Sequence, residues 1–126
     1  MIAGLVIDTV DIERIVASIS REAGFREMIF SKKEIAYCEA KANKFECYAA
    51  RFAAKEAFFK ALGTGWLEGT QFNEVEITNN EIGKPELGFL GETKKTISSW
   101  GIDKILVSLS HTKISASAVV IIEKQV

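Results

Sequence analysis

Apolar side chains recur at helical spacing through the middle of the chain. At about 100° per residue, one stripe of this segment carries aromatic and alanine side chains together with a single carboxylate. Its members are Phe45, Ala49, Phe52, Glu56 and Phe59. The pattern predicts a helix from about Ala42 to Leu62, which Gly63 is well placed to end. The carboxylate stands out because burying it is costly unless it is paired or binds a metal.

The chain before this helix predicts one strand and two shorter helices. Residues 1–7 are apolar and rich in branched side chains, which indicates a buried strand. Residues 9–24 carry isoleucine and valine at helical spacing, with Thr9 as the expected cap and Gly24 as the end. Ser31 and Glu34 have the spacing of a capping box, so a further helix is expected to begin there.

The period changes after the helix. Residues 72–78 alternate polar and apolar, as a half-buried strand does, and the turn residues after them precede a returning strand. A modest helix ending at Gly101 is followed by two strands joined through residues 111–113. This order predicts an α+β fold, with a mainly antiparallel sheet packed against the long central helix. We expect residues 1–126 to form a single domain.

Composition narrows the class of protein. The chain has 126 residues, is 48% hydrophobic and carries a formal net charge of −1, so it fits one globular domain and lacks the basic excess of a nucleic-acid-binding protein. No run approaches the roughly 18 apolar residues of a membrane span. The apolar start has no basic leader, so we expect a cytoplasmic protein. Cys38 and Cys47 are then expected to be free thiols, with a disulfide as the less favoured alternative.

Asp8 and Glu56 are the carboxylates most suggestive of chemistry. Asp8 is expected to end the first strand, where a helix cap or a solvated strand end is an equal alternative. For Glu56 the alternative is an ion pair with Lys60 at the rim of the stripe. Taken together, two carboxylates on rigid elements are the usual protein share of a magnesium site, which takes its other ligands from water and substrate phosphates.

Groups that could bind an anion lie beside and beyond these acids. Lys60 supplies a point charge, and Gly63 and Gly65 would let backbone N–H groups approach an anion closely, although a plain glycine cap is favoured for one G-x-G. The glycines follow the helix, so this is not a Walker loop. His111 is the only histidine, and it is either a satisfied core group or, with the hydroxyl of Thr112, a phosphate or ribose contact.

Two arginines lie on one face of the first predicted helix. Arg14 and Arg21 are seven positions apart, with Arg26 just beyond. Either this is a solvated helix face, or it is a basic patch for an acidic protein partner.

Five segments in this order carry a resemblance to a known family. They are "GLVIDTVDIERI", "FSKKEI", "RFAAKEAFFKALGTG", "GKP" and "VSLSHTKISASAVV". Together they resemble the bacterial holo-[acyl-carrier-protein] synthases, the small class of 4′-phosphopantetheinyl transferases. The resemblance spans nearly the whole chain, and the helix segment is its most specific part.

The resemblance implies an activity, a metal and partners. Such enzymes transfer 4′-phosphopantetheine from coenzyme A to a serine of an acyl carrier protein, need Mg²⁺ and are typically homotrimers with sites between subunits. Asp8 and Glu56 would hold the metal against the coenzyme A diphosphate, and Lys60 would lie beside the phosphates. The residues expected around the nucleotide end are Arg51, Gly63, Gly65, Pro85, His111 and Thr112. Arg14 and Arg21 would face the carrier protein.

Two positions depart from the family pattern, and two other functions compete with transfer. Val6 stands where glycine is common, which would add bulk near the cleft, and Ser115 replaces a usual aromatic residue. The first competing function is a binding module that holds coenzyme A or a carrier protein without turnover. The second is a magnesium-dependent nucleotide hydrolase, which would need no carrier protein.

Overall fold

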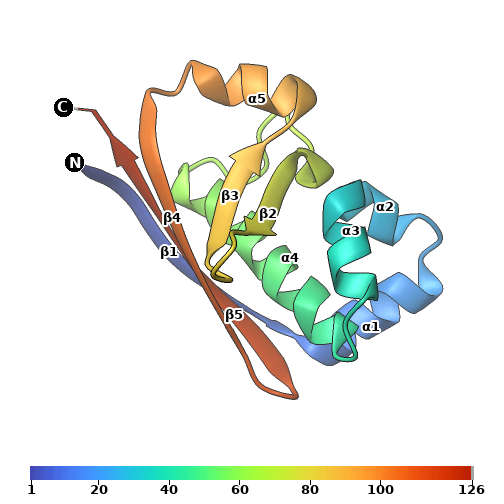
Figure 1. Cartoon of the computed structure of the whole chain (residues 1–126). Helices are drawn as coiled ribbons and strands as arrows, with labels where there is room; N and C mark the ends of the chain where they lie inside the picture. The colour runs from blue at the N-terminus through green and yellow to red at the C-terminus, as the bar shows by residue number, and fades with distance from the viewer. Residues whose placement is uncertain (126) are drawn as a thin grey trace.

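One long helix, α4 (Lys44–Ala61), runs through the middle of the molecule, and the other elements pack around it (Figure 1). The structure is a computed structural model and describes residues 1–125. The other elements, in chain order, are β1 (Ile2–Asp11), α1 (Ile12–Arg21), α2 (Phe25–Ile29), α3 (Lys32–Glu39), the 3₁₀ turn η1 (Phe72–Glu74), β2 (Val75–Asn79), β3 (Pro85–Phe89), α5 (Gly91–Ser98), β4 (Ile102–His111) and β5 (Ser115–Lys124).

The strands form two sheets, and every pairing is antiparallel. The larger sheet has the order β1-β5-β4, and the smaller one is the β2-β3 hairpin. The predicted α+β fold, with antiparallel strands against a long central helix, is therefore confirmed. In the larger sheet Asp8 lies opposite Ala118.

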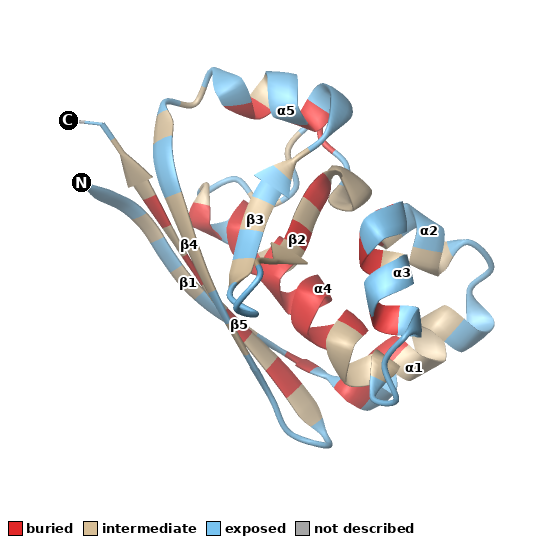
Figure 2. Ribbon diagram, viewed as in Figure 1, coloured by how far each residue is buried: buried red, intermediate tan, exposed pale blue. Residues whose placement is uncertain are grey.

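The core surrounds α4 on nearly all sides, as the buried stretch of this helix in Figure 2 shows. Two clusters of buried apolar side chains meet on it, one with α1 and α3 and one with the larger sheet and α5. Gly4 permits a close contact between β1 and α4, since a Cβ there would lie 2.2 Å from the carbonyl oxygen of Ala61. This close approach brings the strand that carries Asp8 against the helix that carries Glu56.

Several predicted boundaries are confirmed, and others need correction. Ser31 and Glu34 form the expected capping box. β1, however, continues to Asp11 because its ladder with β5 continues that far, so Asp8 lies within the strand and Thr9 is not a helix cap. α1 ends at Arg21, three residues before the expected end at Gly24, and the short helix α2 beyond Gly24 was not predicted. The φ of 83° at Gly24 separates the two helices.

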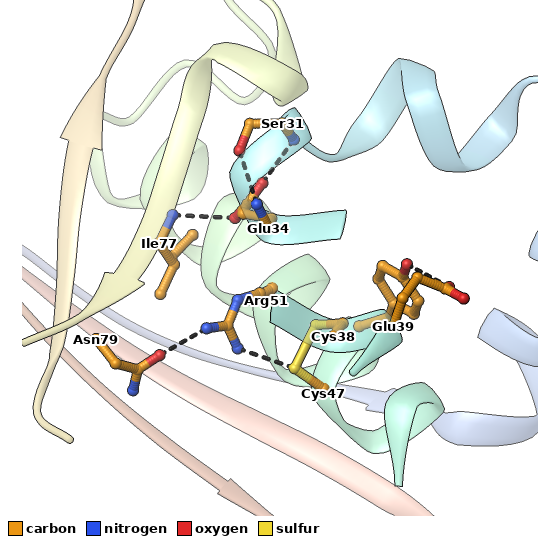
Figure 3. The surroundings of a disulfide bond; sticks show 9 residues. Ser31, Glu34, Cys38, Glu39, Cys47, Arg51, Ile77 and Asn79 are labelled. Atoms are coloured by element: carbon orange, nitrogen blue, oxygen red, sulfur yellow. Dashed lines mark hydrogen bonds between the residues drawn. A yellow bond between two sulfur atoms is a disulfide. The ribbon is translucent and has the colours of Figure 1, made fainter. Parts of the chain in front are cut away.

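Cys38 and Cys47 form a disulfide, which corrects the expectation of two free thiols (Figure 3). The short loop between α3 and α4 folds the two helices against each other and brings the two Cα atoms to 5.5 Å, within the range that a disulfide spans. The sequence expectation rested on the cellular compartment, whereas the pairing depends on how these helices pack.

A buried ion pair joins three elements beneath the surface. Lys55 of α4 donates to Glu34 of α3 at 2.7 Å, and both side chains are 0% exposed. Glu34 also accepts from the backbone N–H of Ile77 in β2, while Lys55 donates to the carbonyls of Phe72 and Val75. Burial lowers the pKa of Lys55, and the Glu34 charge opposes that shift. The pair fixes the β2-β3 hairpin to the helices.

Candidate active site

Asp8 of β1 and Glu56 of α4 lie close enough for the charge of Asp8 to act on Glu56. Glu56 is partly buried, and its pKa is raised, first by burial and then by the negative charge of Asp8. Arg14 and Lys60 act in the opposite direction on Glu56. The ammonium of Lys60 lies 3.2 Å from Asp8 Oδ2. The cation therefore pairs with Asp8, and the alternative of a Glu56–Lys60 ion pair at the helix rim is not what forms.

The acid pair has the donor set that a magnesium ion uses. Across residues 1–125, no group of three or more His, Cys, Asp or Glu side chains gathers as a closed metal site. Mg²⁺ needs only one or two protein carboxylates when water and substrate phosphates complete its shell. A cation between the two acids would also offset the like-charge repulsion that raises the pKa of Glu56. The residues thus fit Mg²⁺ but do not form a complete cage.

The glycine loop after α4 ends the helix. Gly63 and Gly65 have φ of 87° and 68°, and their N–H groups donate to the carbonyls of Lys60 and Phe59. These N–H groups are therefore already used, in line with the glycine-cap alternative. No atom lies within 4 Å of where a Cβ would stand on either glycine, so the loop leaves open space beside Lys60.

Arg51 is a second buried cation of α4, besides Lys55. It is only 3% exposed, and burial lowers its pKa. Its Nη2 donates to Asn79 Oδ1 at 2.6 Å, and its Nη1 donates to Cys47 Sγ at 3.3 Å (Figure 3). Its guanidinium carbon lies 4.5 Å from the centre of the Tyr37 ring. Its Nε is buried without a partner. A buried guanidinium with an unused donor is suited to binding an anion.

Arg51 and His111, which lies at the end of β4, both line a cavity of about 220 Å³. Tyr37 and Lys41 line the same cavity. Sequence reasoning missed both, because only the folding of α3 onto α4 carries them there.

The β2-β3 hairpin adds Pro85 to this region. Pro85 pairs with Asn79 across the hairpin, and Asn79 in turn accepts the hydrogen bond from Arg51. Asn79 was not a candidate from the sequence. Thr112 lies in the β4-β5 turn, where its hydroxyl accepts from the N–H groups of Ile114 and Ser115.

The candidate residues thus form two groups on opposite sides of α4. Glu56 and Lys60 lie with Asp8 on one side, and Arg51 lies with His111 on the other. At about 100° per residue, Glu56 is about 140° around the helix from Arg51, and Lys60 is about 180° from it. One small anion cannot bridge these groups within one chain.

The two arginines of α1 are exposed, as a docking face requires. Arg14 lies 5.6 Å from the centre of the Phe52 ring, and its charge lowers the pKa of Glu56. Arg14 therefore borders the acid pair, whereas Arg21 lies in the last turn of the helix.

The two departures from the family pattern have different surroundings. Val6 points toward α4 and packs against the core cluster beneath the sheet. Ser115 takes part in the β4-β5 turn through its contacts with Thr112.

Two carboxylates with a lysine, and a buried arginine elsewhere on the same helix, are typical of proteins that bind phosphorylated substrates. The family model of the 4′-phosphopantetheinyl transferase superfamily matches residues 7–113, which include every candidate residue. The chain belongs to this superfamily.

Relatives of similar length carry one name. The chain is 46% identical over 126 residues to a holo-[acyl-carrier-protein] synthase of Cytophaga hutchinsonii, covering 98% of this chain and 99% of the relative. It is 44% identical over 124 residues to a holo-[acyl-carrier-protein] synthase of Solibacter usitatus, covering 98% and 99%.

Solved structures agree with this assignment. The crystal structure of holo-[acyl-carrier-protein] synthase from Neisseria meningitidis superposes with a TM-score of 0.89 at 31% identity, covering 98% of this chain and 100% of that one. The Helicobacter pylori synthase in complex with coenzyme A superposes with a TM-score of 0.80 at 30% identity, covering 94% and 99%.

Proposed function

We propose that this protein transfers 4′-phosphopantetheine from coenzyme A to a serine of an apo-acyl carrier protein, releasing adenosine 3′,5′-bisphosphate. The observation that carries the proposal is the group of Asp8, Glu56 and Lys60, in which two carboxylates and a cation from two elements meet at one point. A protein that only binds coenzyme A has no need of a pair of acids whose repulsion raises the pKa of Glu56. The acid pair therefore favours catalysis over a binding module.

The roles follow from the charges. Asp8 and Glu56 would hold Mg²⁺, which when bound neutralises charge on the diphosphate of coenzyme A. Lys60, whose side chain is 54% exposed, can turn from Asp8 toward a phosphate oxygen. The serine hydroxyl loses its proton as its oxygen attacks phosphorus, and a carboxylate of the acid pair, acting through a water molecule, would accept that proton.

Arg51 would bind the other end of coenzyme A. Its buried charge and unpartnered Nε suit a phosphate group, and the neighbouring cavity contains His111. Pro85 lies at the hairpin next to Arg51. Gly63 and Gly65 are proposed to offer space rather than free backbone donors, because their N–H groups are already bonded, and Thr112 is proposed to offer its hydroxyl.

We further propose a homotrimer with sites between subunits. The two groups of residues lie on opposite sides of α4, so a bound coenzyme A would use the acid pair of one chain and the arginine group of another. The outer face of the larger sheet exposes apolar side chains, among them Ile2 at 60%, Leu5 at 63% and Ile7 at 68%. An apolar sheet face of this kind is suited to contact with further copies.

The proposed location is the cytoplasm. Within residues 1–125, no helix has both the length and the apolar character to cross a bilayer. A structural disulfide is uncommon in a reducing compartment.

The decisive experiment is the intact mass of an apo-acyl carrier protein after incubation with this protein, coenzyme A and Mg²⁺. A gain of one phosphopantetheine that disappears when EDTA is added is the expected result. No gain with several folded carrier proteins would overturn the proposal. Coenzyme A binding without any gain would then indicate a binding module, and release of adenosine bisphosphate without a carrier would indicate a hydrolase.

A further inference from the structure

The disulfide of the structure lies against the arginine that is proposed to bind coenzyme A. Cys47 and Arg51 are one turn apart on α4, and Nη1 of Arg51 donates to Cys47 Sγ at 3.3 Å (Figure 3). The other cysteine, Cys38, is fixed on α3 and is 0% exposed. Any change in the chemistry of Cys47 therefore acts on the guanidinium directly.

The two sulfur atoms differ in their access to solvent. Cys38 is sealed in the core between α3 and α4. Cys47 is only partly buried and lines the cavity of about 220 Å³ that also contains Arg51 and His111. A small thiol or disulfide reagent entering this cavity would reach Cys47 first, and Cys38 is placed to complete the exchange.

We propose that Cys38 and Cys47 form a reversible redox site that controls the charge available at Arg51. The inference rests on the proposed function, because it takes Arg51 as a coenzyme A contact. In the disulfide form, Cys47 Sγ is an uncharged and weak acceptor, so the guanidinium keeps its charge for an anionic ligand. In the reduced form, the neighbouring Arg51 favours the thiolate of Cys47. That thiolate pairs with Arg51 and competes with a phosphate group.

Oxidation is a balanced exchange with a low-molecular-weight disulfide such as glutathione disulfide. The Cys47 thiolate attacks one sulfur of the reagent, which forms a mixed disulfide and releases one glutathione thiolate. Cys38 then attacks Cys47 Sγ, which closes the protein disulfide and releases the second glutathione. Two electrons pass from the protein to the reagent, and the two thiol protons end on the two glutathione molecules. Excess dithiol reagent reverses both steps.

The test measures binding of adenosine 3′,5′-bisphosphate to the full chain by titration calorimetry, without any carrier protein. One sample is oxidised with glutathione disulfide and the other is reduced with dithiothreitol, and alkylation followed by intact mass counts the free thiols in each. We expect two alkylated thiols only in the reduced sample. Its Kd should be about three- to tenfold higher, because a charge-assisted hydrogen bond to the ligand is lost.

Single substitutions separate the charge of Cys47 from the tether between the helices. C38S keeps a thiol beside Arg51, so it should bind the nucleotide as weakly as the reduced protein. C47S breaks the same tether but cannot form a thiolate, so its affinity should stay near that of the oxidised protein. R51A should bind weakly and with the same Kd in both redox states, because the group that senses the thiolate is gone.

The outcomes are distinct. Two alkylated thiols after glutathione disulfide treatment, or equal Kd values in the two states, would overturn the inference while leaving the proposed transferase untouched. Equal weakening by C38S and C47S would overturn it as well, since the tether and not the thiolate would then act. If neither state binds the nucleotide, the assignment of Arg51 is wrong and the inference falls, but the mass assay on the carrier protein still judges the transferase.

Discussion

The ammonium of Lys60 lies 3.2 Å from Asp8 Oδ2, although the two residues are 52 positions apart in the chain. The contact joins the end of α4 to the middle of β1. Asp8 is largely enclosed, with a side chain 14% exposed, whereas the Lys60 side chain is 54% exposed. The acid is therefore fixed and the cation is free to turn. This is the arrangement expected where Lys60 changes partner when a phosphate arrives.

Replacing Lys60 tests that change of partner. K60A should raise the KM for coenzyme A by about tenfold, as expected for one charge-assisted contact, and leave the KM for the carrier protein nearly unchanged. K60R should recover part of the loss, since it keeps the charge. Steady-state kinetics with each substrate varied in turn measures both values. Equal changes in the two KM values would contradict the placement of Lys60 at the phosphates.

Glu56 should be essential for transfer but not for folding. We expect E56Q to lower kcat/KM by at least about 10²-fold, because the amide carries no charge for Mg²⁺. Its folding should be retained, because the substitution also removes the repulsion by Asp8 that raises the pKa of Glu56. Intact-mass kinetics and circular dichroism check the two statements. E92Q serves as the control, since the Glu92 side chain is 75% exposed on α5. Near-parental rates for E56Q at saturating Mg²⁺ would refute the metal assignment.

The two arginines of α1 should differ in their effect. R21E should raise the KM for the acidic carrier protein and leave that for coenzyme A nearly unchanged, with a loss that shrinks as salt screens the charges. R14E should do the same and also lower kcat, because the charge of Arg14 acts on Glu56. Kinetics at two salt concentrations test the pair. If R21E raised the KM for both substrates equally, the assignment of this face to carrier-protein docking would be wrong.

The sequence predicted features that lie within one segment better than contacts between distant segments. The α4 helix, the capping box at Ser31 and the antiparallel strands follow from local periodicity, and they were predicted. Glu56 became a candidate because a carboxylate in an apolar stripe conflicts with local rules, and Asp8 because it closes the apolar run of the first strand. Such a conflict can be read from one segment alone.

What the sequence missed is the contact between distant segments. Lys55 is one position from Glu56 and is 0% exposed, yet its partner Glu34 lies 21 positions away. Tyr37 and Asn79 reach Arg51 only after α3 and the β2-β3 hairpin have packed on α4. One signal was available, because a helix that is buried on nearly all sides must pair any lysine inside it.

A hydrogen bond at the end of α3 gives a prediction for pH. Tyr48 donates to Glu39 at 2.6 Å, and this bond is the largest cause that lowers the pKa of Glu39. A lowered carboxyl pKa stabilises the fold above the unfolded value, and that stability is lost as the pH falls through the folded value.

Y48F should therefore destabilise the protein at pH 7 and much less at acid pH. We expect a loss of about 1 kcal/mol at pH 7, at the low end for a bond to a charged group because solvent screens Glu39. Below the ordinary value of 4.5 the difference from the parent should shrink progressively. Urea unfolding at several pH values measures it, with E39Q as the control. A difference that does not depend on pH would indicate lost packing rather than the lost bond.

Two lysines of α4 should differ sharply in what they contribute to stability. K60A removes an exposed ion pair with Asp8 and should cost less than about 1 kcal/mol. K55A leaves Glu34 charged and buried without its cation, together with the unpaired carbonyls of Phe72 and Val75, and should cost about 3–5 kcal/mol. Urea unfolding of both variants makes the comparison on one helix. A similar loss for the two would mean that water enters around Glu34 and that the pair does not hold the hairpin on the helices. A large loss for K55A alone would show that the charge of Lys55 holds the β2-β3 hairpin on the helices. The position of Asn79 beside Arg51 would then depend on a residue that lies outside the proposed site.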